Sequence, residues 1–357
     1  MNPVQEAYKK KYDKKAFVNL RPLLGNFNWA EFLFLIGGAQ AGKSYAIIDF
    51  FVNQFINKGT VFYWLRLTEA QTRKLLQNNA EQLVDPDIRE KYNLDLVTSG
   101  SNVYQVIKRS EPDKNGKTKI LEKKLMARVY ALSTFYQQKG AGIFNKDYDG
   151  WYNIGIDEMQ PEKNERRTFD VVYAFVRQLE NLVRNTKTKV RVIGACNLLE
   201  EASDILSCFN FIPENFGIYK LKSKRCVIDY IEPTNEYKEM RRGSIADILL
   251  PNASMYSNKQ DIDYSLVDKR PLIYPSYIIK FGKEKDKMFT VWDHNIITKY
   301  NGEKKPIVPM RPYLDETYIQ DRVKNIILQF DTRSFHFRNL ITFKLFQKEL
   351  ELLKPRS

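Results

Sequence analysis

Residues Gly37 to Ser44 match the phosphate-binding loop pattern GxxxxGK[ST] at every defined position. In such a loop the glycines let backbone N–H groups point at phosphate oxygens, the lysine reaches the β- and γ-phosphates, and the final hydroxyl binds Mg²⁺. An apolar run, 32–36, precedes the loop, and apolar residues at helical spacing follow it over 44–56. A buried strand before the loop and a helix after it are the context that this chemistry requires. The sequence therefore predicts an ATP and Mg²⁺ site formed by Gly37, Gly38, Ala39, Gln40, Ala41, Gly42, Lys43, Ser44 and Tyr45.

A second, acidic element is expected at the end of another buried strand, because the phosphate loop alone does not hydrolyse ATP. The apolar segment 152–156 is followed by Asp157 and Glu158. Asp157 is predicted to hold Mg²⁺ through water, together with the serine of the loop. Glu158 is predicted to polarise the attacking water as a general base. The next buried strand, 190–196, is followed by Asn197, which we expect to contact the γ-phosphate and to sense its loss.

Strands and helices alternate between the phosphate loop and this last strand. That alternation predicts an α/β fold with a mainly parallel sheet that is covered on both faces. More than one strand separates the loop from the acidic pair, and the pair includes a glutamate. These two features predict the additional-strand, catalytic-glutamate branch of P-loop ATPases rather than the kinase or GTPase branch. From about Pro233 the chain becomes polar, so we expect an ATPase domain over 1–234, a linker segment over 235–262 and a smaller α+β domain over 263–357.

Basic side chains provide two further predictions. Transition-state charge is often neutralised by an arginine from a neighbouring subunit, and Arg184, at the end of a predicted helix, is our first candidate, ahead of Arg177 and Arg191. The second prediction concerns a hairpin with an Asn-Gly turn. Lysines that follow phosphates give affinity without sequence preference, and a solvated exposed hairpin is the alternative. The predicted nucleic-acid contacts of this hairpin are Lys114, Lys117, Lys119, Lys123 and Lys124.

The charge of the chain favours a polyanionic partner. Lys and Arg total 57 against 43 Asp and Glu, which gives a formal net charge of +14, and nucleic acid is the commonest polyanion that such basic proteins bind. The three cysteines, Cys196, Cys208 and Cys226, have no CxxC spacing. Their pattern argues against a disulfide framework or a zinc site and fits a reducing compartment. No apolar run approaches the ~20 residues that span a bilayer, so we expect a soluble intracellular protein without a membrane partner.

With these motifs, the chain resembles the DNA-packaging ATPases of small tailed podophages of the phi-29 type. Those proteins are relatives of large terminase subunits and of the FtsK–HerA translocases. The resemblance extends over nearly the whole chain, although identity is low outside the motifs. Beyond the loop it rests on Tyr45 and Ala46, on Arg66 in the second strand, on the glycine-rich loop 138–142, on the finger segment 182–185, on the sensor segment 195–197, and on 329–331 and 338–346 near the C-terminus.

The resemblance implies a homopentameric ring at the portal of an empty capsid. Double-stranded DNA would pass through that ring while ATP hydrolysis drives it inward. A packaging RNA that binds the motor is implied for close relatives. Such a motor works in the host cytoplasm and transiently at the procapsid portal vertex, and it is not a component of the mature virion. We therefore expect ATP and Mg²⁺ as ligands, and DNA, the portal and copies of the same chain as partners.

One departure from the resemblance lies within the phosphate loop. The loop of the family often carries an arginine where this chain has Gln40. A neighbouring subunit can supply the missing charge, and Lys139, on a glycine-rich loop, is our candidate for that role. A solvated lysine is the alternative interpretation.

The C-terminal domain resembles the ribonuclease H-like nuclease domain of large terminases. That nuclease needs several carboxylates that converge on two metal ions. The strand 277–281 carries no Asp or Glu, and Asp293, which ends the next strand, has no obvious partners. We therefore predict a vestigial nuclease fold that binds without cleaving. Its basic residues, Lys280, Lys283, Lys285 and Lys287, could contact packaging RNA or the portal.

Two alternatives to a DNA-translocating ATPase remain open. The first is a packaging terminase with an active nuclease, and the missing carboxylate cluster argues against it. The second is a nucleotide-gated nucleic-acid-binding protein that docks without moving DNA. The complete pair of Asp157 and Glu158 argues against this second alternative.

Overall fold

The computed structural model describes residues 17–38, 40–138, 150–159, 169–183, 189–197, 203–213, 215–242, 248, 264–310 and 321–353. These residues fall into two compact units, and each is described by itself. The first unit takes the described residues up to 248 except Leu206–Ile212. The second takes Leu206–Ile212 and the described residues from 264 onward.

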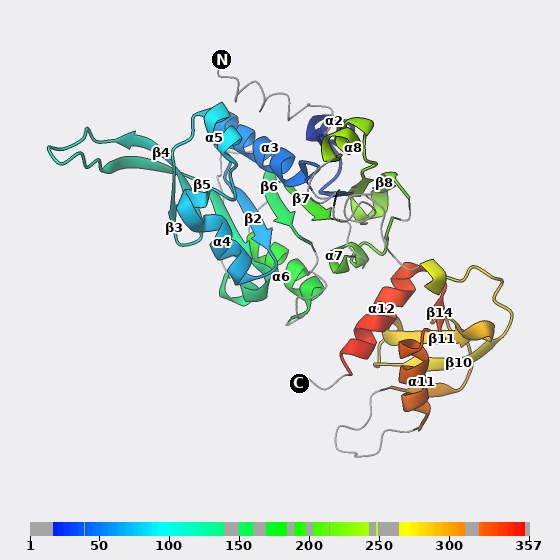
Figure 1. The fold of residues 1–357 in the computed structure, drawn as a ribbon. Helices are drawn as coiled ribbons and strands as arrows, with labels where there is room; N and C mark the ends of the chain where they lie inside the picture. The colour runs from blue at the N-terminus through cyan, green and yellow to red at the C-terminus, as the bar shows by residue number, and fades with distance from the viewer. Residues whose placement is uncertain are drawn as a thin grey trace. The chain divides into compact units, whose positions relative to one another are not determined.

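A large, mostly parallel sheet forms the framework of the first unit (Figure 1). Its strands in the described ranges are β1 (Phe32–Gly37), β2 (Phe62–Arg66), β3 (Leu96–Ser99), β4 (Asn102–Arg109), β5 (Ile120–Ala131), β6 (Tyr152–Asp157), β7 (Val190–Asn197), β8 (Gly217–Leu221) and β9 (Cys226–Tyr230). They lie in the order β3-β4-β5-β2-β6-β7-β1-β9-β8. All neighbours from β5 to β9 run parallel. The predicted α/β architecture with a mainly parallel sheet is therefore confirmed.

The helices of this part of the chain follow the strands in sequence. They are α2 (Leu20–Asn26), α3 (Lys43–Lys58), α4 (Glu69–Ala80), α5 (Pro86–Tyr92), η1 (Leu132–Gln138), α6 (Val171–Val183), α7 (Asp204–Ser207), η2 (Lys222–Lys224) and α8 (Asn235–Arg241). Helix α3 begins and ends at glycines in the left-handed conformation, Gly42 and Gly59. Its buried apolar residues belong to one core with those of β1, β2, α4 and α5. This core fixes the phosphate loop between β1 and α3.

Two strands of this sheet need glycine for close packing. A Cβ atom at Gly155 in β6 would lie 2.3 Å from Cε3 of Trp64 and 2.9 Å from Cε2 of Phe51. A Cβ atom at Gly194 in β7 would lie 2.6 Å from Cδ1 of Phe34. Side chains are therefore excluded at both positions, and aromatic rings pack directly against the backbone of the two strands that carry the acidic pair and Asn197.

Residues 235–241 form helix α8, where a linker segment was expected. The side chain of Thr234 caps the helix by accepting a hydrogen bond from the N–H of Tyr237, at 3.1 Å. Tyr237 is buried and packs with Ala41 of the phosphate loop, and Phe17 packs against the same cluster. The segment after β9 therefore supports the back of the loop instead of only connecting two domains.

The second unit contains a five-stranded sheet in the order β13-β10-β11-β12-β14. The strands are β10 (Pro275–Lys280), β11 (Met288–Trp292), β12 (Ile296–Lys299), β13 (Ile307–Pro309) and β14 (His336–Phe337), and the helices are η3 (Tyr264–Leu266), η4 (Lys285–Lys287), η5 (Asp293–Asn295), α11 (Asp321–Asp331) and α12 (Leu340–Glu351). Phe346 of α12 lies at the centre of the core, with its ring centroid 5.1 Å from that of Phe289 and 5.3 Å from that of Phe281. Within the described ranges of the whole chain, no helix is long and apolar enough to span a membrane.

Candidate active site

The phosphate loop is held in shape by the segment that precedes α2. The N–H of Val18 donates a hydrogen bond to the carbonyl of Ala41, at 3.1 Å. Gly42 has a φ of 76°, and a Cβ atom there would lie 2.9 Å from Cδ1 of Phe17. Both the backbone conformation and the neighbouring ring therefore require glycine at this position. Gln40 also has a positive φ, 62°, whereas Ala39 lies outside the described residues.

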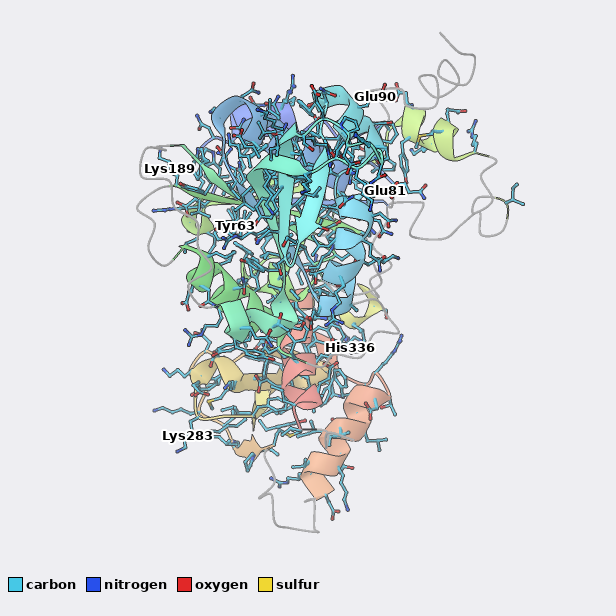
Figure 2. The ribbon with its side chains drawn as sticks, turned by 90° about the vertical axis from the view of Figure 1, so that its left-hand side faces the viewer. Tyr63, Glu81, Glu90, Lys189, Lys283 and His336 are labelled. Carbon is cyan, nitrogen blue, oxygen red and sulfur yellow. The ribbon has the colours of Figure 1, made fainter. Side chains whose placement is uncertain are left out.

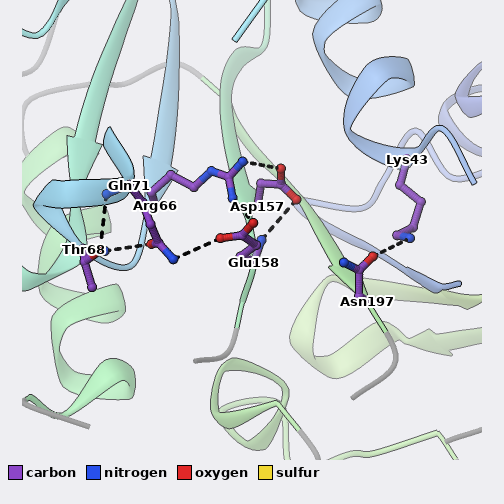
Figure 3. Close-up of polar contacts among 7 residues, drawn as sticks. All are labelled: Lys43, Arg66, Thr68, Gln71, Asp157, Glu158 and Asn197. Carbon is purple, nitrogen blue, oxygen red and sulfur yellow. Dashed lines mark hydrogen bonds and ion pairs between the residues drawn. The ribbon is translucent and has the colours of Figure 1, made fainter. Parts of the chain in front are cut away.

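Lys43 is the buried cation of the loop, with 4% of its surface exposed. Its Nζ donates hydrogen bonds to the carbonyl oxygens of Gly37 and Gly38, at 3.0 and 2.6 Å, and to Oδ1 of Asn197, at 3.1 Å (Figure 3). Burial lowers the pKa of Lys43 from 10.5 to about 8, and the neighbouring Cys196 and Asp157 oppose this shift. Strands β1 and β7 pair in parallel, with Gly37 beside Asn197. This pairing brings Lys43, which follows Gly37 in the loop, into contact with Asn197.

Both carboxylates at the end of β6 form an ion pair with the same arginine. Arg66, the last residue of β2, places Nη2 3.0 Å from Oδ2 of Asp157 and Nη1 2.7 Å from Oε1 of Glu158 (Figure 3). Asp157 also accepts a hydrogen bond from the side chain of Ser44. Burial raises the pKa of Asp157, although Arg66 and the bond from Ser44 act in the opposite direction. The loop serine and the first carboxylate therefore lie side by side, and the metal site expected between them stays a prediction.

Glu158 is held by a second contact that comes from α4. Nε2 of Gln71 donates a hydrogen bond to Oε2 of Glu158, at 3.0 Å, while Oε1 of Gln71 accepts one from the N–H of Thr68, at 3.1 Å. Thr68 and Gln71 form a capping box at the start of α4. Glu158 itself has a φ of 56°, a conformation that is rare outside glycine and that recurs at functional sites. Both carboxylate oxygens of Glu158 are thus engaged.

Arg66 and Gln71 are site residues to which sequence reasoning assigned no role. The signal for Gln71 is present in the sequence, because Thr68-Glu69-Ala70-Gln71 fits the capping-box pattern. That pattern predicts the start of a helix, and it contains nothing about a carboxylate on another strand. Arg66 shares with Asp157 and Asn197 the position of a polar residue at the end of a buried strand.

Two cavities adjoin the phosphate loop. The larger, of about 590 Å³, is lined by Gln40, Gly42 and Tyr45 of the loop region, by Phe17 and Asn19 of the preceding segment, and by residues of α3 and α5. The smaller, of about 350 Å³, reaches Ser44, Arg66 and Asp157. An elongated ligand on the loop would therefore have room on both sides of Tyr45, which lines both cavities.

The structure describes two of the four basic residues that the sequence suggests as acting from a neighbouring subunit. Lys139 and Arg184 both lie outside the described residues. Arg191 is buried, and its guanidinium donates hydrogen bonds to the carbonyls of Ala30 and Asn28, at 3.3 and 3.1 Å. Arg177 is exposed and pairs with Glu180 at 2.8 Å. Arg191 therefore has a structural role, whereas Arg177 stays at the surface of α6.

The fold of the chain is similar to that of solved packaging-motor proteins. A chain of the bacteriophage Phi-29 viral genome packaging motor assembly matches with a TM-score of 0.58 and 19% identity, over 95% of this chain and 100% of that one. This chain has the fold of a phage packaging motor. A chain of the Phi-28 gp11 DNA packaging motor matches the same fold with a TM-score of 0.58 and 13% identity, over 96% and 99% of the two chains. The structural resemblance expected from the motifs is thereby confirmed.

Other comparisons are more distant. The ATPase domain of the large terminase of Thermus phage P74-26 matches with a TM-score of 0.38 and 12% identity, over 65% of this chain and 89% of that one. No protein-family model matches the sequence, and no curated protein does. The packaging-motor fold is thus established by structure alone, and the function depends on the site.

Proposed function

We propose that this protein is an ATP-driven motor that moves double-stranded viral DNA into a preformed capsid through the portal. The observation that carries the proposal is the convergence of Lys43, Ser44, Asp157 and Asn197 at one edge of the sheet in a packaging-motor fold. Glu158 adjoins this cluster through Arg66. A cation for phosphates, oxygen ligands for a metal ion and a carboxylate base are the groups that ATP hydrolysis by such a loop requires.

The site belongs, in this proposal, to the additional-strand, catalytic-glutamate type. Support comes from the strand order, because β7 lies between β1, which leads to the phosphate loop, and β6, which ends in the acidic pair. Ser44 and Asp157 fit a Mg²⁺ ion, since both offer hard oxygen ligands and already contact one another. When bound, the ion would neutralise charge on the β- and γ-phosphates.

The adenine base has a place in the larger cavity. Phe17, Tyr45 and Phe50 supply aromatic walls there, and Asn19 and Asn53 supply polar groups. Charged residues line it as well, namely Arg21, Asp49, Asp85, Asp87 and Lys91. A concave site with apolar walls and placed polar groups is typical of sites for small organic ligands. We therefore assign the phosphates to the loop and the base to the side of Tyr45 that faces Phe17.

We infer that Glu158 leaves its present contacts before it polarises a water molecule, because a carboxylate held by a cation and an amide is a weak base. Arg66 and Gln71 occupy both of its carboxylate oxygens. In this proposal these two side chains release Glu158 for hydrolysis, and Arg66 can do so while it keeps its second contact, with Asp157. The contact between Gln71 and Glu158 connects this release to the start of α4.

Gln71→Glu tests the release step. Glutamate keeps the acceptor of the capping box, but it removes the donor to Glu158 and sets a like charge beside it. We expect DNA-independent ATP hydrolysis to rise about tenfold or more, because a hydrogen bond to a charged group contributes about 1.5–3 kcal/mol. Phosphate release at saturating ATP measures the effect, with Gln77→Glu on the same helix as the matched control. A lower rate at unchanged ATP affinity would show instead that Gln71 orients Glu158 for catalysis.

The affinity for ATP is expected to fall as the pH rises through about 8. Burial lowers the pKa of Lys43 in the free site to about 8, while bound phosphates favour its charged form. Above that pH a proton must be taken up for each ATP bound, so the dissociation constant should rise about tenfold per pH unit. Calorimetry from about pH 7 to about 9.5, in buffers of different ionisation enthalpy, measures both affinity and proton uptake. An affinity that stays constant over this range would contradict the assignment.

The C-terminal unit is proposed to be a vestigial ribonuclease H-like domain. Support comes from its topology, since β10, β11 and β12 form an antiparallel meander and β13 pairs parallel with β10. The pairing of β14 with β12 instead of β13 departs from that fold. Asp293 accepts a hydrogen bond from the N–H of Ile273, at 3.2 Å, and the described residues contain no group of three or more His, Cys, Asp or Glu placed to hold a metal ion. Metal-dependent nicking of plasmid DNA by the purified protein would revive the nuclease alternative.

The assembly remains a proposal that follows from the resemblance. In it, a pentameric ring works at the procapsid portal in the host cytoplasm, and a neighbouring subunit contributes Arg184 or Lys139 to each site. Basic residues of the second unit are proposed contacts for the portal or a packaging RNA, among them Lys283, which lies at the surface in Figure 2. Mass measurement of the assembled protein with and without ATP tests the ring.

One experiment separates the motor from a nucleotide-gated binding protein. Phosphate release is measured with and without duplex DNA, and movement is followed by displacement of a third strand bound to that duplex. We expect DNA to raise the ATPase rate and ATP to be required for displacement. DNA binding that responds to ATP without any displacement would favour the binding protein and contradict the motor.

A further inference from the structure

Strands β4 and β5 continue beyond the sheet as a two-stranded ribbon, the projecting hairpin, which we define as residues 107–124. Every residue of it except Ser110 is exposed. In Figure 1 it extends away from the other elements of the first unit, and Figure 2 is turned so that this side faces the viewer. It lies at the start of β5, whereas the nucleotide site lies at the ends of β6 and β7, so it is no part of that site.

The tip of the projecting hairpin is ordered by its own hydrogen bonds. Oδ1 of Asp113 accepts bonds from the N–H groups of Asn115 and Lys117, both at 2.8 Å, and the carbonyl of Asp113 accepts one from Gly116, at 2.9 Å. Ser110 and Lys119 pair across the two strands next to this turn. The N–H of Ser110 donates to the carbonyl of Lys119, at 2.8 Å, and the N–H of Lys119 donates to Oγ of Ser110, at 2.7 Å. The side chain of Asp113 thus binds backbone N–H groups of the turn, whereas Glu111, Glu122 and the lysine side chains are exposed.

The structure sorts the basic residues of the projecting hairpin into two groups. Those near the sheet are engaged within the protein, since Nζ of Lys123 lies 4.3 Å from the ring centroid of Tyr104 and Nζ of Lys124 lies 5.2 Å from that of Phe55. Arg109 pairs with Asp95 at 2.6 Å. The other group forms no ion pair with any described residue and consists of Lys108, Lys114, Lys117 and Lys119. Lys108 lies opposite Glu122 in the strand pairing, and the other three lie nearer the tip.

We propose that the projecting hairpin grips a nucleic-acid duplex through Lys108, Lys114, Lys117 and Lys119. A two-stranded ribbon fits the major groove of B-form DNA, and lysines without internal partners are available to phosphates on both sides. Three large aliphatic side chains on the ribbon, Ile107, Ile120 and Leu121, are 48%, 40% and 57% exposed. Apolar side chains exposed together mark a surface that a partner covers, and in a groove they contact thymine methyl groups.

The composition of the grip favours binding without sequence preference. The four cations without an ion pair are lysines, which act on phosphates as point charges. Lysine can also contact guanine in the major groove, but the arginine of the hairpin, Arg109, is already paired with Asp95. At the tip, Asn115 has a side chain that could recognise a base edge. Its backbone N–H is bound by Oδ1 of Asp113. Binding that ignores sequence is what movement along a genome needs, and in this respect the inference rests on the proposed motor function.

The test compares two variants of the full-length protein that lose the same charge. In the first, Lys108, Lys114, Lys117 and Lys119 become glutamine. In the second, four other exposed lysines of the first unit without ion pairs to described residues become glutamine, namely Lys58, Lys74, Lys222 and Lys224. Fluorescence anisotropy measures the affinity for duplexes of about 30 base pairs and mixed sequence, between about 50 and 200 mM salt.

We expect the hairpin variant to lose at least about tenfold in affinity at low salt, and its slope of log affinity against log salt to become shallower by about 3 to 4. The control variant should stay within about twofold, and the melting temperatures of both variants should match the wild type. Equal losses in the two variants would show that net charge alone acts, and that result overturns the grip. A wild type that binds no duplex overturns it as well.

Parallel arms with DNA and RNA duplexes of equal length identify the source of the phosphates. Loss confined to one duplex assigns the grip to that nucleic acid, and loss on both shows that it accepts either. Binding of a fluorescent ATP analogue and phosphate release from ATP are measured on the same samples. If the wild type binds ATP and the hairpin variant keeps full duplex affinity, the grip is wrong while the motor proposal stands. If the wild type lacks ATP hydrolysis, the motor proposal fails and the duplex result still decides the grip.

Discussion

Glu158→Gln is expected to lower ATP hydrolysis by about 10²–10⁴-fold while ATP affinity stays within a few fold. Glutamine has nearly the shape of glutamate, so the fold around β6 should persist, but its amide cannot accept the proton of the attacking water. Glu158 is 42% exposed, and its contacts are to Arg66 and Gln71, outside the phosphate loop. Nucleotide binding should therefore survive. Single-turnover phosphate release and calorimetric titration with ATP measure the two quantities.

Two controls make this result specific. Glu180→Gln removes a surface carboxylate that pairs with Arg177, and it should leave hydrolysis unchanged. Asp157→Asn removes the carboxylate that contacts Ser44, and it should weaken Mg²⁺-dependent binding as well as turnover. Normal hydrolysis by Glu158→Gln would show that another group activates the water, and the assignment of the general base would then be wrong.

The meeting of the site residues follows from features that the sequence displays. Polar residues come directly after buried strands, and parallel strands end at the same edge of a sheet. In this sheet Gly37 pairs with Asn197 and Asp157 pairs with Ala195, so the ends of β1, β6 and β7 lie at the same edge. Short apolar runs bounded by glycine or polar residues were sufficient to locate β1, β2, β6 and β7. For these strands, local pattern and final structure agree.

The contacts of Glu158 could not be predicted in the same way. Arg66 and Glu158 are far apart in sequence, and their contact depends on the neighbouring positions of β2 and β6, which only the assembled sheet defines. Helix α4 loses regular helical geometry after Leu76, because Gln77 has an extended ψ of 154° and Asn78 and Asn79 adopt positive φ values of 50° and 58°. Asparagine tolerates that conformation better than most residues, so composition alone did not mark the end of the helix.

Short elements were also missed where their signals are weak. Helix α8 begins at a single Thr cap within a polar segment, and the burial of Tyr237 against Ala41 decides its place. Strand β14 has only two residues, His336 and Phe337. Strands this short carry no periodicity that a sequence pattern can detect, and their pairing partners in the assembled sheet determine them.

Lys43→Met is expected to abolish detectable ATP binding without lowering the stability of the free protein. Nζ of Lys43 is the buried cation that faces the loop carbonyls, and removal of a charge that pairs with phosphates should weaken binding by at least about 100-fold, since charge-assisted bonds are the strong ones. Methionine keeps a long, unbranched side chain in the same space. Calorimetry and the shift of melting temperature with ATP report the loss of binding.

The stability part of this prediction follows from the sign of the pKa shift. The pKa of Lys43 is about 8 in the folded protein and 10.5 for an unperturbed lysine, so at pH 7 the unfolded chain holds this proton more strongly and the buried charge opposes folding. A neutral side chain removes that opposition, and the melting temperature without ATP should stay equal or rise. Lys58→Met, at the exposed end of the same helix, should change neither ATP binding nor stability. A Lys43→Met protein that binds ATP normally would disprove the phosphate role, and one that melts at a lower temperature would show that Lys43 stabilises the loop through its bonds to Gly37 and Gly38.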